Sequence, residues 1–82
     1  MVHVTLHSIT GVLGSVESVP TTSLGDVVEL FKQQNMISIP GVIAYNATVV
    51  RKPDLKQPIA NFATADKLDL WFMPSLIHAS FD

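Results

Sequence analysis

The side chains that could act in catalysis or bind a metal are few and widely spaced in this sequence. His3 and His7 share one side of an alternating segment, where about 3.3 Å per residue puts them roughly 13 Å apart. That separation is too large for one metal ion, so both are interpreted as surface histidines of a strand. Asp26 and Glu29 fall at the start of a helical pattern, where acidic residues commonly stabilise the helix dipole. These residues therefore predict neither a metal site nor an acid–base pair.

The sequence also lacks the motifs that would supply other chemistry. It contains no cysteine, so a thiolate nucleophile, a disulfide and a thiolate metal site are excluded. It has no glycine-rich phosphate loop and no metal-ligand spacing. Ser75 and Ser80 have no His and Asp pattern that would activate them. We expect a protein that is not an enzyme, with no catalytic residues, no metal and no cofactor.

The composition indicates a small domain with apolar side chains on its surface. The 82 residues make one domain, and 48% of them are hydrophobic. Only 15% are charged, against about 25% in ordinary soluble domains. A domain this small buries only about 60% of the surface that its unfolded chain exposes. We expect some apolar side chains to stay exposed for a protein partner or a second copy of the chain. The alternative is a monomer whose surface is built from Ser, Thr, Asn and Gln.

Charge and hydropathy argue against several classes of protein. The net charge is −2, and basic residues adjoin only at Arg51 and Lys52, which argues against nucleic-acid binding. No apolar stretch approaches the ~20 residues of a membrane-spanning helix. The N-terminal residues alternate in polarity and do not resemble a signal peptide. We expect a cytoplasmic protein that binds neither nucleic acid nor membranes.

The first part of the chain predicts a hairpin. Residues 2–7 alternate apolar and polar side chains, which is typical of a half-buried strand. Gly11 marks a turn, because glycine tolerates positive φ. A second strand is predicted from about 13 to 19, and Gly14 with the broken alternation around it indicates a β-bulge.

A helix with one apolar face is predicted after this hairpin, over residues 24–34. Ser23 is a suitable N-cap, with Asp26 three residues later as in a capping box. The apolar residues repeat at the spacing that places them on one helix face: Leu24, Val27, Val28 and Phe31.

The rest of the chain predicts three more strands. Residues 42–50 read as strand, tight turn and strand, with Asn46 in the turn. Residues 51–65 contain two prolines and no sustained period, so they are interpreted as a connection with at most one short helical turn. From Asp66 the alternation resumes and predicts a last strand that stops at Pro74.

This order predicts an α+β domain with a mixed four- to five-stranded sheet and one main helix packed across it. If the first and last strands pair side by side in parallel, the fold is a β-grasp. We divide the chain into a domain of residues 1–73 and a C-terminal tail of residues 74–82.

Four segments of the sequence carry a family resemblance; in chain order they are "ITGVLGSVESV", "TTSLGDVVELF", "AYNATVV" and "ADKLDLWF". Together they resemble the ubiquitin-like superfamily, and most of all the ThiS/MoaD sulfur carriers and the bacterial ubiquitin-like proteins. "ITGVLGSVESV" is similar to the first turn and second strand of ubiquitin, and "TTSLGDVVELF" to the start of its helix. "AYNATVV" resembles the strand–Asn–strand segment of the ThiS-type carriers, and "ADKLDLWF" their last strand. The resemblance covers residues 2–73 and implies a ubiquitin-like β-grasp fold.

The resemblance also implies a surface for protein recognition, because ubiquitin uses an apolar patch on its sheet. The matching positions here are Ile9, Ala44 and Trp71, and Met73 extends them along the last strand. Trp and Met are favoured at the centres of interfaces. The alternative is that Trp71 is covered by the tail or by Tyr45.

The tail departs from the family pattern. Conjugating and sulfur-carrying members end in Gly-Gly, because a slim terminus must enter an activating enzyme for adenylation. This tail contains no glycine; its residues are Pro74, Ser75, Leu76, Ile77, His78, Ala79, Ser80, Phe81 and Asp82.

Three functions remain open after this comparison. The first is an unconventional bacterial-type protein modifier whose tail is processed or conjugated, with an E1-like activating enzyme and a peptidase as partners. The second is a β-grasp interaction subunit that self-assembles or binds a partner through its apolar sheet surface and tail. The third is a ThiS/MoaD-type sulfur carrier with an atypical C-terminus.

Overall fold

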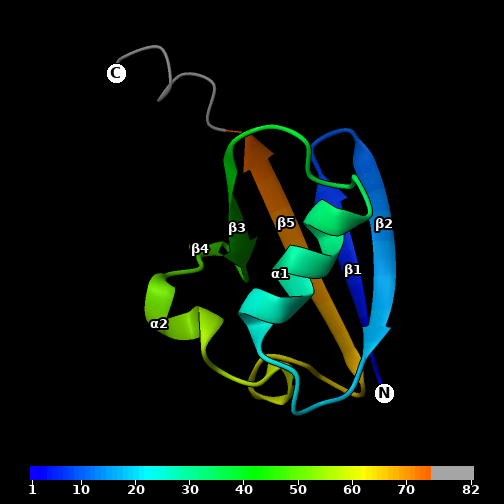
Figure 1. The fold of residues 1–82 in the computed structure, drawn as a ribbon, viewed down its shortest axis with the longest axis vertical. Helices are drawn as coiled ribbons and strands as arrows, with labels where there is room; N and C mark the ends of the chain where they lie inside the picture. Colours follow the sequence, from blue (N-terminus) through cyan, green and yellow to red (C-terminus); the bar gives the residue numbers. More distant parts are fainter. Residues whose placement is uncertain (75–82) are drawn as a thin grey trace.

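The computed structural model describes residues 1–74, which form an α+β fold of one mixed sheet and one main helix (Figure 1). The elements along the chain are β1 (Val2–Ser8), β2 (Gly11–Ser18), α1 (Leu24–Gln33), β3 (Gly41–Tyr45), β4 (Thr48–Val49), α2 (Lys52–Leu55), a short 3-10 helix (Ile59–Asn61) and β5 (Lys67–Pro74). The predicted hairpin, main helix and last strand are therefore confirmed. None of the helices within residues 1–74 is both long enough and apolar enough to cross a membrane.

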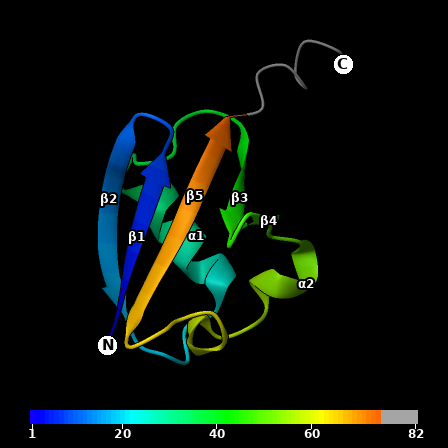
Figure 2. The ribbon, with the colours of Figure 1, turned by 180° about the vertical axis from the view of Figure 1, so that it is seen from behind.

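The sheet has the order β2-β1-β5-β3-β4. β1 and β5 are parallel neighbours at its centre, as expected for the first and last strands, and the other pairs are antiparallel. Helix α1 crosses one face of the sheet, whereas the view from behind shows that no helix of residues 1–74 covers the other face (Figure 2). We call this uncovered side the open face.

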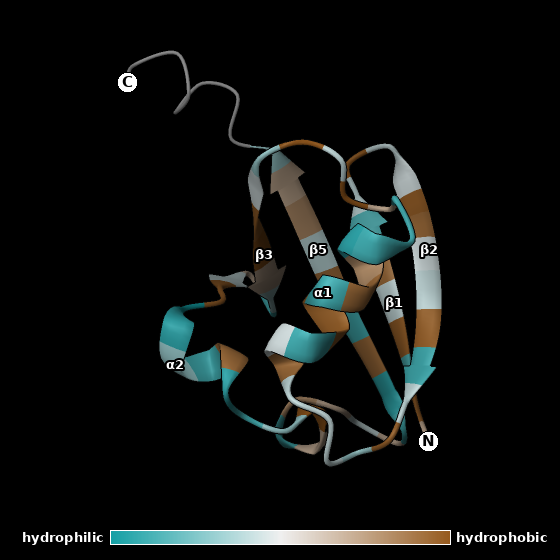
Figure 3. Cartoon of the chain, in the orientation of Figure 1, coloured by the Kyte–Doolittle hydropathy of each residue, from teal (hydrophilic) through white to brown (hydrophobic). Residues whose placement is uncertain are grey.

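Alternation along the two central strands builds the core beneath α1, as the banding of β1 and β5 by hydropathy shows (Figure 3). Every second residue of each strand is buried, and the apolar face of α1 packs on these side chains. The main members of the core are Val2, Val4, Leu6, Leu24, Val27, Val28, Phe31, Leu68, Leu70 and Phe72.

Both ends of α1 are fixed by local hydrogen bonds. At the start, the Ser23 Oγ accepts a hydrogen bond from the Asp26 backbone N–H at 3.2 Å, as expected for an N-cap. At the end, Asn35 adopts φ 61°, and the Met36 N–H donates to the Phe31 carbonyl at 3.0 Å. This is a Schellman arrangement, in which a left-handed residue ends the helix and satisfies its last carbonyls.

The bulge predicted near Gly14 is confirmed. Leu6 pairs with Gly14, but His7 pairs with Val12, so Leu13 is the extra residue on β2. Residues 14–18 alternate in burial after the bulge, whereas residues 11–13 before it are all exposed.

The turn between β3 and β4 has the geometry that the sequence predicted at Asn46. Asn46 and Ala47 have φ of 48° and 64°, and Tyr45 pairs with Thr48 across the turn. Two central residues with positive φ form a type I′ turn, whose twist matches that of the strands.

The last strand ends one residue later than predicted, because Pro74 belongs to β5 and lies opposite Gly41. Proline has no N–H to donate, but it is tolerated where no partner would accept one. By the alternation along β5, the nitrogen of Pro74 points toward the β1 side, and β1 pairs with β5 only as far as Trp71. The other residues assigned to the tail, 75–82, lie outside the described part of the chain.

Candidate functional site

The open face of the sheet carries several of the exposed apolar side chains that the composition predicted. Strand β5 places Trp71 and Met73 on this face, because the alternate residues Leu70 and Phe72 point into the core. The cross-strand neighbours on β3 are Ala44 beside Trp71 and Val42 beside Met73. The alternation of these two strands thus creates an apolar surface away from α1.

All four residues predicted for partner binding line one open hollow of about 410 Å³ on this face. We call it the open-face hollow. Its lining residues are Ile9, Ala44, Ala47, Trp71, Phe72 and Met73. The structure therefore brings the predicted residues together, although they come from three separate parts of the chain.

The four side chains contribute differently to the hollow. Ile9 is 90% exposed, whereas Trp71 and Met73 are 44% and 40% exposed. Ala44 is only 4% exposed and forms part of the floor. A small floor residue between larger walls leaves room for a side chain of another molecule.

Trp71 is held in place by His7 on the same face, and Asp69 in turn holds His7. The His7 ring stacks on the indole with 4.5 Å between ring centroids and 23° between planes. The His7 Nε2–H in turn donates to Asp69 Oδ1 at 2.9 Å. His7 and Trp71 are paired residues of β1 and β5, so the sheet register itself creates this stack. An aromatic side chain fixed before binding loses little conformational entropy in a complex.

Several further residues belong to this surface that the sequence patterns did not predict. Val42 and Val49 are 38% and 43% exposed and extend it across β3 and β4. Their signal was the alternation with Ala44, since Val42 precedes it by two residues and Val49 pairs with it across the turn. The role of His7 beside Trp71 had no such signal, because it depends on the register between strands far apart in sequence.

The alternative that Tyr45 covers Trp71 is wrong. Tyr45 follows Ala44 and therefore points to the opposite side of β3, where its ring meets Phe62 edge-on at 5.2 Å between centroids. The alternative that the tail covers Trp71 concerns residues outside the described part of the chain.

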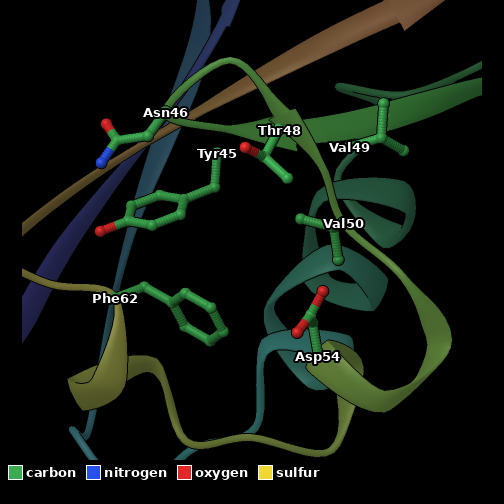
Figure 4. Close-up of a pocket in the computed structure, with 7 residues that line it drawn as sticks. All are labelled: Tyr45, Asn46, Thr48, Val49, Val50, Asp54 and Phe62. Carbon is green, nitrogen blue, oxygen red and sulfur yellow. The ribbon is translucent and has the colours of Figure 1, made fainter.

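A second hollow, of about 220 Å³, lies between the β3–β4 hairpin and α2 (Figure 4). Tyr45 and Phe62 form one side of it, and Asp54 stands on the other. The Asp54 carboxylate accepts a hydrogen bond from the Arg51 backbone N–H at 2.9 Å, so it caps α2. The Tyr45 hydroxyl points away from Asp54 (Figure 4), and this hollow is interpreted as a by-product of helix capping and core packing.

The two strand histidines lie on the open face, as predicted, and each has a carboxylate neighbour. His3 Nδ1 is 3.6 Å from Glu17 Oε1, and His7 is bonded to Asp69. Within residues 1–74 no three side chains of the types that bind metals form a cluster.

Comparison of the sequence with protein families and with curated proteins identifies no relative. No model of a protein family matches the sequence, and no curated protein matches it at a significant level.

Proposed function

We propose that this chain is a ubiquitin-like β-grasp protein that binds another protein through the open face of its sheet. The observation that supports this function best is the open-face hollow, where Trp71 is half-exposed and braced by His7. The partner would present an apolar side chain to the hollow, because its exposed walls are Ile9, Trp71 and Met73.

The β-grasp assignment is supported by the arrangement of the sheet. Its two terminal strands lie in parallel at the centre, a hairpin begins the chain, and a single main helix crosses one face. The four segments that resemble ubiquitin-like proteins fall on the corresponding elements in the same order. For example, the segment that resembles the second strand of ubiquitin forms the bulged strand β2, and the strand–Asn–strand segment forms the β3–β4 hairpin with its turn at Asn46.

Binding through this surface can be tested with a photo-crosslinking residue at position 73 and at position 29. Met73 borders the open-face hollow, whereas Glu29 is exposed on α1, on the other side of the sheet. In the cells that naturally produce the protein, we expect discrete adducts from position 73 and none of the same species from position 29. Adducts formed equally from both positions, or none from position 73, would contradict the proposal.

Trp71→Ala is expected to weaken binding to the crosslinked partner by about 30-fold or more. Truncation of a central interface residue commonly costs about 2 kcal/mol or more, and 1.4 kcal/mol is tenfold. Calorimetric titration measures the change, and circular dichroism verifies the fold. Val19→Ala is the matched control, because Val19 is 51% exposed but does not line the hollow. An unchanged affinity for Trp71→Ala would refute this surface.

A second candidate, an unconventional protein modifier, is supported by the resemblance and by the position of Pro74. β5 ends at the rim of the sheet, where Pro74 lines a further hollow of about 310 Å³ together with Ile9, Leu13 and Ile39. A chain that continues from Pro74 therefore starts beside an apolar surface. An activating enzyme could hold this rim while the terminal carboxylate reacts.

The intact mass of the protein isolated from its natural cells separates the candidate functions. A trimmed chain, or one joined to another protein through its carboxylate, supports the modifier. A terminal thiocarboxylate supports a sulfur carrier with an atypical C-terminus. An unmodified chain that retains its binding through Trp71 supports the interaction subunit alone.

A further inference from the structure

Among residues 1–74, no strand pairs with the outer edge of β2, which is therefore a long free edge of the sheet. β2 has eight residues and stands at one end of the strand order, whereas β4 at the other end has two. β2 forms the margin of the sheet in both views of the ribbon (Figures 1 and 2). A free edge of this length can pair with a strand of another chain.

The β2 edge lacks the devices with which proteins usually prevent such pairing. Natural edges carry Lys or Pro, or are short. β2 is eight residues long and contains neither Lys nor Pro. Its only charged residue is Glu17, whose carboxylate is 3.6 Å from the His3 ring. Val12 and Leu13 are 63% and 38% exposed beside the edge. The bulge at Leu13 disturbs only one end of the strand.

The backbone groups along the middle of this edge point outward. The His3 N–H donates to the Asp66 carbonyl at 2.9 Å, so His3 faces β5 and the next residue, Val4, faces β2. Val4 is paired with Val16, whose backbone groups therefore face β1. By alternation, the N–H and C=O of Ser15 face away from the sheet, and no strand within residues 1–74 pairs with them.

We propose that β2 pairs in antiparallel fashion with β2 of a second copy of this chain, about a twofold axis at Ser15. This register places Gly14 opposite Val16 of the second copy, so a residue without a side chain faces a branched one. Glu17 lies opposite Leu13 of the second copy, which puts the two Glu17 residues four positions apart, roughly 13 Å. That separation exceeds the ~8 Å screening length at physiological salt, so the two carboxylates do not oppose pairing.

The resulting dimer joins two five-stranded sheets into one continuous sheet. An isologous pair of this kind closes on itself, because the same edge is used by both copies. The open face of each copy stays free, so the dimer presents two open-face hollows. Two hollows on one particle would strengthen binding to a partner that repeats its own site. The dimer and the proposed function are independent, because β2 does not line the hollow.

Ser15→Pro tests the edge selectively. Its N–H points outward, so proline removes the donor for the second copy and leaves the hydrogen bonds to β1 in place. Sedimentation over a concentration series is expected to show the wild-type mass rising to that of two chains, and Ser15→Pro at one chain throughout. Ser15→Thr, which keeps the N–H, is expected to dimerise like the wild type.

Three outcomes of this series would overturn the dimer. They are a wild-type chain that stays monomeric at every concentration, a Ser15→Pro chain that is folded and still dimeric, and a dimer abolished by Trp71→Ala. The last result would place the contact on the open face instead.

A cysteine pair tests the register even if Ser15→Pro does not fold. The chain has no native cysteine, so a single introduced thiol can cross-link only to the same position of a second copy. With Ser15→Cys, the two Cα atoms would lie about 5.5 Å apart, within the range of disulfides. We expect a covalent dimer on mild oxidation of Ser15→Cys and none for Glu17→Cys, whose thiols would be roughly 13 Å apart. Equal cross-linking of both variants, or none of Ser15→Cys, would reject the proposed register.

Discussion

Ile59→Ala is expected to lower the free energy of unfolding by about 2 to 5 kcal/mol, which is the usual cost of truncating a buried isoleucine. Ile59 is fully buried although it lies in the 3-10 helix of the connection between β4 and β5. Its N–H donates to the Thr22 carbonyl at 2.8 Å, which ties the connection to the segment before α1. The backbone is therefore fixed, and the cavity left by the substitution cannot close easily. Urea unfolding followed by circular dichroism measures the change.

Ile9→Ala is the matched control for this substitution, because it removes the same atoms from a side chain that is 90% exposed. Its free energy of unfolding should stay within about 0.5 kcal/mol of the wild type. A small protein has a total stability of only about 5 to 15 kcal/mol, so the Ile59 variant loses a large fraction of it. Equal effects of the two substitutions would mean that the connection does not belong to the core.

The burial of Ile59 is a feature of this fold that could not be predicted from the sequence. Periodicity predicted β1, α1 and β5, because each of these elements exposes one side and buries the other over several residues. Residues 51–65 have no such repeat, because α2 and the 3-10 helix are single turns. Ile59 is buried because it joins the core cluster formed by residues of α1 and the sheet, and no local sequence pattern predicts that position.

In the candidate site, too, some features could be predicted from local sequence patterns and others could not. Alternation along β5 and the resemblance to ubiquitin-like proteins predicted that Trp71 and Met73 share one face, and the structure has them there. The pairing of His7 with Trp71 depends on how β1 and β5 align, and these strands are distant in sequence: His7 and its hydrogen-bond partner Asp69 are 62 positions apart. The shape of the hollow depends on Ala44 as well, which the sequence predicted only as a member of the patch. The structure shows that this small residue forms the floor.

Gly41→Ala is expected to lower the free energy of unfolding by about 2 to 3 kcal/mol, at the upper end of the usual cost of overpacking. A Cβ atom at position 41 would lie 2.5 Å from the Phe72 ring and 2.6 Å from the Met73 carbonyl oxygen. Phe72 is a core residue that is 5% exposed, and the Met73 carbonyl belongs to the sheet, so neither can move alone. The same displacement would disturb the open-face hollow, since Phe72 and Met73 line it. Thermal unfolding followed by circular dichroism measures the loss.

Gly14→Ala is the comparison for Gly41→Ala, because its added Cβ overlaps only with a flexible side chain that can move away. Its Cβ would lie 2.6 Å from the Met36 Sδ, as close as at position 41, but the contact is with the end of an unbranched side chain at a partly buried position. Met36 can change rotamer, and alanine in place of glycine restricts the unfolded chain and adds about 0.4 to 1 kcal/mol of stability. We expect Gly14→Ala to stay within about 1 kcal/mol of the wild type, well above Gly41→Ala in stability. If both variants lost the same stability, the Met36 side chain would be held as rigidly as the Phe72 ring. The packing of β2 against the end of α1 would then be tighter than the partial burial of Met36 indicates.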